Sequence, residues 1–152
     1  MSGITVRQAV LADLDLVADL LNQFRVHQGR ASDLAAVRAF LLARFDHGES
    51  VVYLALDGAE PLGFAQLYPS FSSTALARVM ILNDLFVTDA GRRRGVASRL
   101  LAAVEAHAWC HGSTRVTLNV MRTNTAGQAL YEARGWKQDA DFFMYHRFPD
   151  PS

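Results

Sequence analysis

The middle of the chain contains a strand, a helix and a second strand in succession, and this pattern limits the possible folds more than any other feature. The run VMILNDLFV at residues 79–87 is long and apolar, which predicts a strand. Apolar residues then recur at helical spacing from Val96 to His111, and Gly112 supplies a helix stop. Residues 115–121 again favour a strand. This order indicates an α/β domain in which helices pack on a sheet.

The flanking segments extend the same pattern. Ser32 is placed to cap the second helix, and Gly135 is placed to end the last one in a left-handed turn. Together the elements predict a mixed sheet with helices on both faces. The flanking elements are a strand at 4–8, helices at 13–27 and after Ser32, strands at 51–56 and 62–67, a loop at 69–74, a helix at 125–134 and a terminal strand at 142–148.

Composition points to one compact domain spanning residues 1–152. Hydrophobic residues make up 51% of the chain and charged residues 20%, enough apolar material for a core of its own. Basic and acidic residues are equal at 15 each, so no overall field favours nucleic acid or an anionic membrane. The first residues lack a signal-peptide pattern, no uncharged run is long enough to span a bilayer, and Cys110 is the only cysteine. We therefore expect a cytoplasmic protein that binds neither membranes nor nucleic acid.

The junction between the long strand and the helix after it has the composition of an anion-binding site. Residues 88–98 read TDAGRRRGVAS, so three arginines precede Gly95 where the helix begins. A helix N-terminus offers unpaired N–H groups and a partial positive charge, and small residues let a ligand approach the backbone. The lysine-containing phosphate loop of nucleotide hydrolases is excluded, because Val96 follows Gly95. A solvated basic turn is the alternative interpretation.

Two motifs resemble those of the GNAT acyltransferases. Arg92-x-x-Gly95-x-Ala97 resembles the acetyl-CoA signature of this family, and Asn124, seven residues before Tyr131, resembles its next cofactor segment. The element order fits the family over nearly the whole chain. The resemblance implies the GNAT fold, an α/β domain with a mixed, mostly antiparallel sheet and helices on both faces.

The resemblance also implies acetyl-CoA as co-substrate, without a metal. In such folds the fourth strand separates from the fifth after a bulge, which leaves the backbone of Leu85, Phe86 and Val87 to bond the pantetheine arm. Asn124 contacts the cofactor in the family, and the molecule is expected to be a homodimer, with the terminal strand at 142–148 as a candidate interface. The residues implied around the pyrophosphate are Arg92, Arg93, Arg94, Gly95, Val96, Ala97 and Ser98.

Acetylation of an amine needs a neutral nucleophile and a proton for the leaving thiolate. A lysine-like amine has a pKa of about 10.4, so its deprotonation at pH 7 costs about 4 to 5 kcal/mol. Asp84 is the candidate base and Asn83 a candidate for orienting water or substrate, since both lie on the strand beside the expected thioester. One of two neighbours on a strand points away, however, and Asp84 alternatively caps or pairs within the scaffold. Tyr131 faces the sulfur in the family and is the candidate acid, with a packed aromatic as the alternative.

The expected acceptor is the primary amine of a small molecule, which attacks the thioester directly in a ternary complex. The first helix and its following loop commonly form the acceptor wall in the family. Aromatic residues of the strands are further candidates for this wall, or else belong to the core. The implied acceptor residues are Phe24, Arg25, His27 and Gln28, and the aromatic candidates are Tyr53, Phe64, Tyr68 and Phe71.

The segments LNDLFV at 82–87 and LY at 130–131 look most similar to the branch of polyamine and small yeast histone/polyamine acetyltransferases. In the polyamine enzymes an acidic residue commonly stands where this chain has Asn83, so we expect polyamines to be poor substrates. Alternatives to a small amine are a protein lysine or N-terminus as acceptor, and a regulator that binds acyl-CoA without turnover. Tyr131 argues against the regulator.

A histidine pair near the end of the central helix has the spacing of metal ligands. His107 and His111 are one turn apart, with Cys110 between them. Histidines are favoured in the last turn of a helix, and no second pair of ligands is evident. We therefore expect no metal, and we interpret these residues as part of the helix end.

Overall fold

The computed structural model describes residues 3–151 and divides into two compact units, residues 1–119 and 120–152. The first unit contains a five-stranded sheet in the order β1-β2-β3-β4-β5. Neighbouring strands are antiparallel except β4 and β5, which run parallel, as expected for a mixed, mostly antiparallel sheet. The single domain over residues 1–152 remains a prediction. The strands are β1 Ile4–Gln8, β2 Val51–Asp57, β3 Glu60–Ser72, β4 Ala77–Val87 and β5 Ser113–Thr117.

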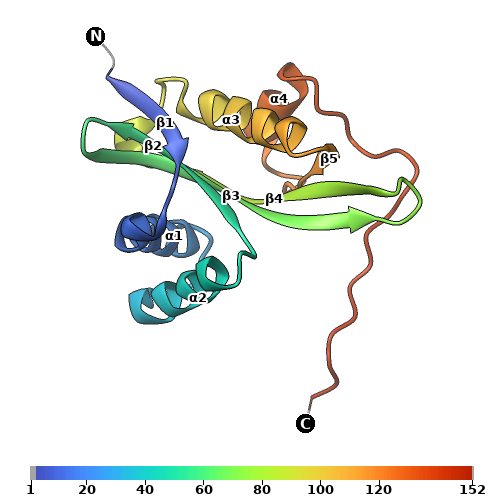
Figure 1. Ribbon diagram of the computed structural model, residues 1–152, viewed down its shortest axis with the longest axis horizontal. Coiled ribbons are helices and arrows are strands. Elements are labelled where there is room, and N and C mark those ends of the chain that lie inside the picture. Colours follow the sequence, from blue (N-terminus) through green and yellow to red (C-terminus); the bar gives the residue numbers. More distant parts are fainter. Residues whose placement is uncertain (1–2, 152) are drawn as a thin grey trace. The chain divides into compact units, whose positions relative to one another are not determined.

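Helices cover both faces of this sheet, which confirms the predicted fold class (Figure 1). The helices α1 (Leu14–His27) and α2 (Leu34–Asp46) lie on one face, and α3 (Val96–Cys110) lies on the other. Two short 3-10 helices, Leu11–Asp13 and Asp89–Gly91, precede α1 and the turn before α3. None of the helices described is long and apolar enough to cross a membrane.

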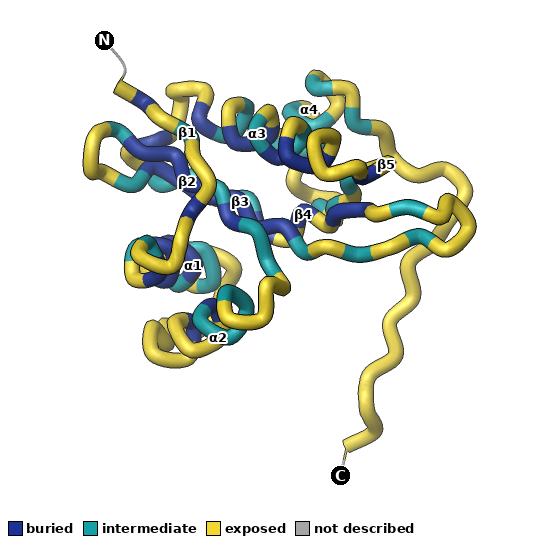
Figure 2. Tube along the Cα trace, viewed as in Figure 1, coloured by how far each residue is buried: buried dark blue, intermediate teal, exposed yellow. Residues whose placement is uncertain are grey.

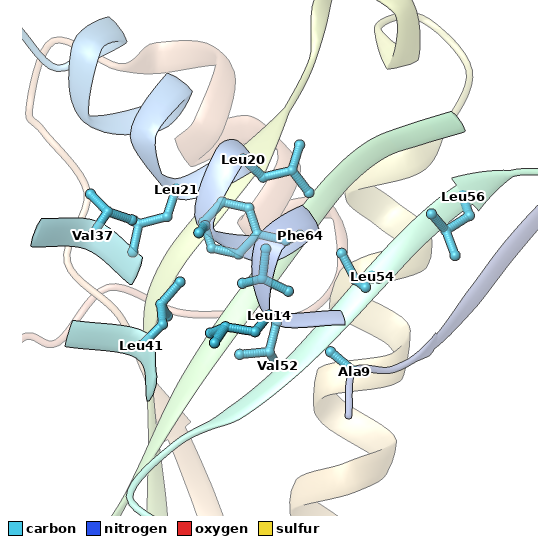
Figure 3. Packing of buried hydrophobic residues seen from close by; sticks show 12 residues of the cluster. Ala9, Leu14, Leu20, Leu21, Val37, Leu41, Val52, Leu54, Leu56 and Phe64 are labelled. Carbon is cyan, nitrogen blue, oxygen red and sulfur yellow. The ribbon is translucent and has the colours of Figure 1, made fainter. Parts of the chain in front are cut away.

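An apolar cluster fixes α1 and α2 against the sheet (Figure 3). Leu20 of α1, Leu41 of α2 and Phe64 of β3 are fully inaccessible to solvent and belong to this one cluster. Figure 2 shows buried residues along the strands and on the helix sides that meet them. Burial of each such side chain contributes roughly 1.5–3 kcal/mol, so the position of α1 over β3 and β4 is well determined.

The strand β4 contains a β-bulge at Asn83. Gln66 of β3 pairs with Asp84 and Leu67 pairs with Leu82, so Asn83 has no partner in this ladder. On its other side β4 pairs with β5 only as far as Ile81. The separation of the two strands after a bulge is the one that the GNAT resemblance implied.

Three predicted boundaries in this unit are wrong. The strand β3 continues to Ser72 and β4 begins at Ala77, because the two long strands pair across most of the predicted loop at 69–74. The cap of α2 is Asp33, whose carboxylate accepts a hydrogen bond from the amide of Ala36 at 3.1 Å. The predicted cap, Ser32, bonds the Asn22 side chain instead. The fifth strand ends at Thr117, four residues before the predicted end.

The second unit contains α4 (Thr125–Ala133), which confirms the predicted short helix. Gly135 ends it at φ 90°, and the amide of Trp136 donates to the carbonyl of Tyr131 at 3.0 Å. The predicted terminal strand at 142–148 is wrong: these residues have no regular structure, and Phe143 is 86% exposed. Alternating sequence alone does not make a strand, because its backbone groups also need a neighbouring strand as partner.

Candidate functional site

The turn between β4 and α3 is held by hydrogen bonds to the start of β3. The amide and the hydroxyl of Thr88 both donate to the carbonyl of Leu62, at 2.8 and 3.2 Å. The Thr88 oxygen also accepts from the amide of Gly91 at 3.3 Å. A Cβ atom at the buried Gly91 would lie 2.7 Å from the Leu62 carbonyl oxygen, so only glycine fits there. These contacts fix the point at which residues 92–98, the anion-binding turn, leave the sheet.

The backbone of the anion-binding turn exposes the start of α3. Arg93 and Gly95 are left-handed, at φ 62° and 73°. The first bond of the helix runs from the amide of Arg99 to the carbonyl of Gly95 at 3.1 Å, so the amides of Val96 and Ala97 precede the hydrogen-bonded ladder. A Cβ atom at Gly95 would meet no atom within 4 Å. The open space, the two amides and the helix dipole together form a geometry suited to an anion.

The three arginines of the turn have different surroundings. Arg94 is 2.6 Å from Asp57 at the end of β2, so its guanidinium ties the turn to the sheet. Arg92 forms an exposed ion pair with Asp89 at 3.3 Å. Arg93 has no ion pair within residues 3–151, and it is exposed. Arg93 is therefore the member of the three whose charge is uncompensated.

The last residues of β4 present a free strand edge beside this turn. Leu85, Phe86 and Val87 pair with β3 on one side, and on the other side the described residues provide no strand neighbour. Half of their backbone N–H and C=O groups point to that open edge. An extended ligand can pair there as an added strand.

A pocket of about 480 Å³ lies between α1, α2 and the sheet. Its walls combine apolar side chains of the helices with polar side chains of β3 and β4, the combination found in small-molecule sites. The volume is within the range of such sites. The pocket is lined by Leu21, Phe24, Arg25, Gln28, Arg30, Ala36, Val37, Phe40, Gln66, Tyr68, Asn83 and Asp84.

The bulge brings Asn83 and Asp84 into this pocket together. Neighbours on a regular strand face opposite sides, so only one of the two was expected to point this way. The extra residue interrupts the alternation, and both side chains line the same cavity. The Asn83 amide nitrogen donates to one Asp84 carboxylate oxygen at 3.1 Å.

Asp84 is a buried acid that has no cationic partner among the described residues. Its residue is 7% exposed, and the Gln66 amide nitrogen donates to its second carboxylate oxygen at 2.6 Å. Burial raises the pKa of Asp84, and the bonds from Gln66 and Asn83 offset part of this rise. Burial, together with the Asp84 charge, raises the pKa of Tyr68 to about 12, so this phenol stays protonated. The inner wall of the pocket therefore contains one carboxyl group that can take up a proton. Hydrogen-bonding groups surround this carboxyl group.

Some of the acceptor residues inferred from the sequence line this pocket. Phe24, Arg25 and Gln28 line it, whereas His27 does not and instead lies 6.3 Å from the ring of Phe86. Of the aromatic candidates, only Tyr68 is a lining residue. Gln66, Arg30 and the wall from α2 were missed. A glutamine in an otherwise apolar strand segment was the available signal for Gln66.

The aromatic candidates outside the pocket have structural surroundings. Phe64 lies in the core, and Phe71 is exposed beside Arg78. The Tyr53 hydroxyl is hydrogen-bonded to His107 Nδ1 at 2.9 Å, and the His107 ring stacks on His111 at 4.1 Å. Burial, together with the nearby His111, lowers the pKa of His107, which favours its neutral form. Cys110 is an exposed free thiol.

In the second unit, Asn124 and Tyr131 lie at the two ends of α4. The Asn124 side-chain oxygen accepts from the amide of Gly127 at 2.9 Å and so caps the helix. The ring of Tyr131 lies 5.9 Å from that of Trp136, and burial raises the pKa of its hydroxyl. Tyr131 is therefore a protonated, half-buried phenol, which is the state that a proton donor needs.

Known proteins match this chain over most of its length. The acetyltransferase (GNAT) family profile matches residues 14–136. An uncharacterised N-acetyltransferase, YhfO of Bacillus subtilis (strain 168), is 41% identical over 92% of this chain and 94% of its own. A solved probable acetyltransferase is 39% identical, with a TM-score of 0.91, over 97% of this chain and 99% of its own. An aminoglycoside N-acetyltransferase solved with CoA shares the fold at 22% identity and a TM-score of 0.80, over 97% of this chain and 96% of its own.

Proposed function

Because the chain belongs to the GNAT acetyltransferase family, we propose that it transfers an acetyl group from acetyl-CoA to the primary amine of a small molecule in a ternary complex. Acetyltransferase activity of the GNAT type follows from the family and its relatives. The co-substrate, the acceptor and the direct mechanism are the proposal. The observation that supports this proposal most is the bulge at Asn83. The bulge precedes a free strand edge, and it directs the buried Asp84 carboxyl group toward a pocket.

Acetyl-CoA fits the residues along β4 and the start of α3. The backbone edge of Leu85 to Val87 suits the amide-containing pantetheine arm, and the amides of Val96 and Ala97 suit the pyrophosphate. Arg93 adds an uncompensated positive charge. A structural relative with the same fold was solved with CoA, which supports the choice of this co-substrate.

Asp84 serves as the base that prepares the amine. An acceptor amine arrives as an ammonium ion at neutral pH and must lose one proton before it can attack. A carboxylate whose pKa is raised by burial holds a proton more strongly than an exposed one, so it is a better base. Asn83 and Gln66 hold the carboxylate in place through their amide groups. Asp84 takes the ammonium proton, and the freed lone pair forms the bond to the acetyl carbon.

The second proton transfer is to the sulfur of the leaving CoA thiolate. As the new carbon–nitrogen bond forms, the carbon–sulfur bond breaks and its electron pair goes to sulfur. We assign Tyr131 as the proton donor on the family resemblance of its position. Its hydroxyl is protonated at neutral pH, since burial raises its pKa further above 10.0. The nitrogen loses two protons in all, one to Asp84 before the attack and one as the amide forms. One of them replaces the proton that Tyr131 gives to sulfur, and the other goes to solvent.

The test is a panel of small amines, aminoglycosides and peptides with acetyl-CoA, read by release of the free CoA thiol. We expect at least one small amine to be acetylated faster than any peptide. For that amine, Asp84→Asn should lower kcat by about 10²–10⁴ at pH 7, because the amide cannot accept the proton. The variant should regain activity as pH rises toward the pKa of the free amine.

Asp15→Asn is the matched control, because Asp15 pairs with Arg38 at the surface and does not line the pocket. It should turn over at the wild-type rate. Wild-type kcat in Asp84→Asn would remove Asp84 as the base. Tight CoA binding without release of CoA for any amine or peptide would instead support the non-catalytic regulator.

A further inference from the structure

We propose that the acceptor carries an anionic group, a carboxylate or a phosphate, as well as its amine, and that Arg25 and Arg30 bind this group. The inference rests on the acetyl transfer proposed above, because it identifies the acceptor class of the same pocket. It follows from how charge is distributed along the walls of the pocket.

Arg25 in the last turn of α1 and Arg30 just after this helix line the pocket, and neither has a carboxylate partner among the described residues. Neither Arg25 nor Arg30 forms a side-chain hydrogen bond or an ion pair in the part of the chain that the structure describes. On the neighbouring α2, by contrast, Arg38 is paired with Asp15 and Arg44 with Glu49. The two pocket arginines therefore present uncompensated positive charge to whatever enters.

The backbone holds these two arginines at one place. Gly29 is left-handed at φ 87°, and this turn lets the amide of Arg30 donate to the carbonyl of Arg25 at 2.8 Å. Arg25 is half-buried and Arg30 is exposed, so both lie toward the solvent end of the pocket. Two arginines whose backbones are joined by a hydrogen bond, and which line the same pocket, are suited to bind one oxyanion.

The opposite charge lies at the buried end. Asp84 is the only acidic side chain among the described residues that line the pocket, and it is almost inaccessible to solvent. Leu21, Phe24 and Val37 add apolar wall to the same pocket. The pocket thus offers a buried carboxyl group, apolar wall and more exposed guanidinium groups, which is complementary to an amine joined to an anion by a short carbon chain.

The same distribution disfavours acceptors with several positive charges. A diamine that places one nitrogen at Asp84 would bring its second ammonium toward Arg25 and Arg30. Like charges in that position oppose binding, and desolvation of the outer ammonium adds to the cost. An aminoglycoside meets the same repulsion, although structural relatives include enzymes named for these acceptors.

A set of acceptors that differ in one end group tests this proposal. We would compare ω-amino acids of two to six carbons with the amino alcohols, diamines and aminoalkyl phosphates of equal chain length. The measured quantity is kcat/KM from CoA release. We expect one anionic series to exceed the amino alcohols by about tenfold or more, and the diamines to be poorest. The better of the two anionic series identifies the carboxylate or the phosphate as the preferred anion.

The double variant Arg25→Gln/Arg30→Gln locates the effect. It should raise KM for the preferred anionic acceptor about tenfold or more, so that the preference for this acceptor over the amino alcohol of equal length falls by about the same factor. Arg38→Gln is the control, because this α2 arginine does not line the pocket. A melting temperature for each variant shows whether loss of positive charge at the end of α1 alters the fold.

Two outcomes would overturn the proposal, and they are distinguishable. Amino alcohols or diamines that match the anionic acceptors, or a double variant that keeps the wild-type KM, would refute the anionic acceptor and leave the acetyltransferase intact. Absence of CoA release with every amine would refute the proposed function itself, and the anionic acceptor with it.

Discussion

Replacement of Gly95 by tryptophan tests CoA binding at the anion-binding turn, because Gly112 provides a matched control. The two glycines lie at opposite ends of α3, with φ of 73° and 81°. At both, a Cβ atom would meet nothing within 4 Å. A side chain in this backbone conformation costs about 1–2 kcal/mol, which lowers the melting temperature by about 2–8 °C in a protein of this size. Gly95→Trp and Gly112→Trp should therefore lose the same stability.

Only Gly95→Trp should weaken the binding of CoA. The indole would occupy the open space in front of the amides of Val96 and Ala97, which have no role in the helical ladder. A hydrogen bond to a charged group contributes about 1.5 kcal/mol or more. Loss of two such bonds to the pyrophosphate costs about 3 kcal/mol, which corresponds to a Kd about 100-fold higher.

Isothermal titration calorimetry with CoA and a thermal melt on the wild type and both variants measure these two quantities. The expected pattern is an equal fall in melting temperature with a loss of affinity confined to Gly95→Trp. Wild-type affinity for CoA in Gly95→Trp would refute the anion-binding turn as the pyrophosphate site. An equal loss in both would assign the effect to distortion of α3.

Three further predictions concern catalysis, acceptor choice and stability. Tyr131→Phe should lower kcat by about 10²–10⁴ if chemistry limits the rate, with CoA affinity and melting temperature nearly unchanged, and wild-type kcat would remove its role as acid. Spermidine should be among the poorest amines in the panel, and the highest kcat/KM for spermidine would show that Asn83 was misinterpreted. Because burial raises the pKa of Asp84 above 3.8, its ionisation destabilises the fold as pH rises. Asp84→Asn should therefore melt above the wild type at pH 7 and lose this advantage as pH falls to about 4, and an advantage independent of pH would contradict the electrostatic cause.

The period of the apolar residues was sufficient to predict most of the sheet and its covering helices. Apolar residues at helical spacing predict α1, α2 and α3, and alternating apolar residues predict β1. Each pattern places the apolar side chains on the one face of the helix or strand that is buried. The arginine-rich junction at 88–98 was predictable too, since its glycines and the start of a helix are local signals. These features depend on neighbours in sequence, so the sequence alone carries them.

Features that depend on a partner segment were less predictable. The strand β3 extends through Pro69 because β4 lies beside it, whereas residues 142–148 alternate as a strand does but have no regular structure. Likewise, the pocket is made by α1, α2 and two strands, so the roles of Arg30 and Gln66 become visible only when these elements are packed together. Asn83 and Asp84 line the same pocket because of a register shift in β4. The alternation of apolar and polar residues does not predict such a shift.

The unpaired position of Asn83 in β4 bears on how acceptor choice can evolve. Most residues of a central strand have a partner across the ladder, so an exchange there alters the pairing as well as the surface. Asn83 has no such partner, yet its side chain lines the pocket next to Asp84. Substitutions at this position can therefore change the chemistry offered to an acceptor while the register of the sheet is conserved. A lineage that carries this bulge can diversify its substrates through single mutations at one site with little loss of foldability.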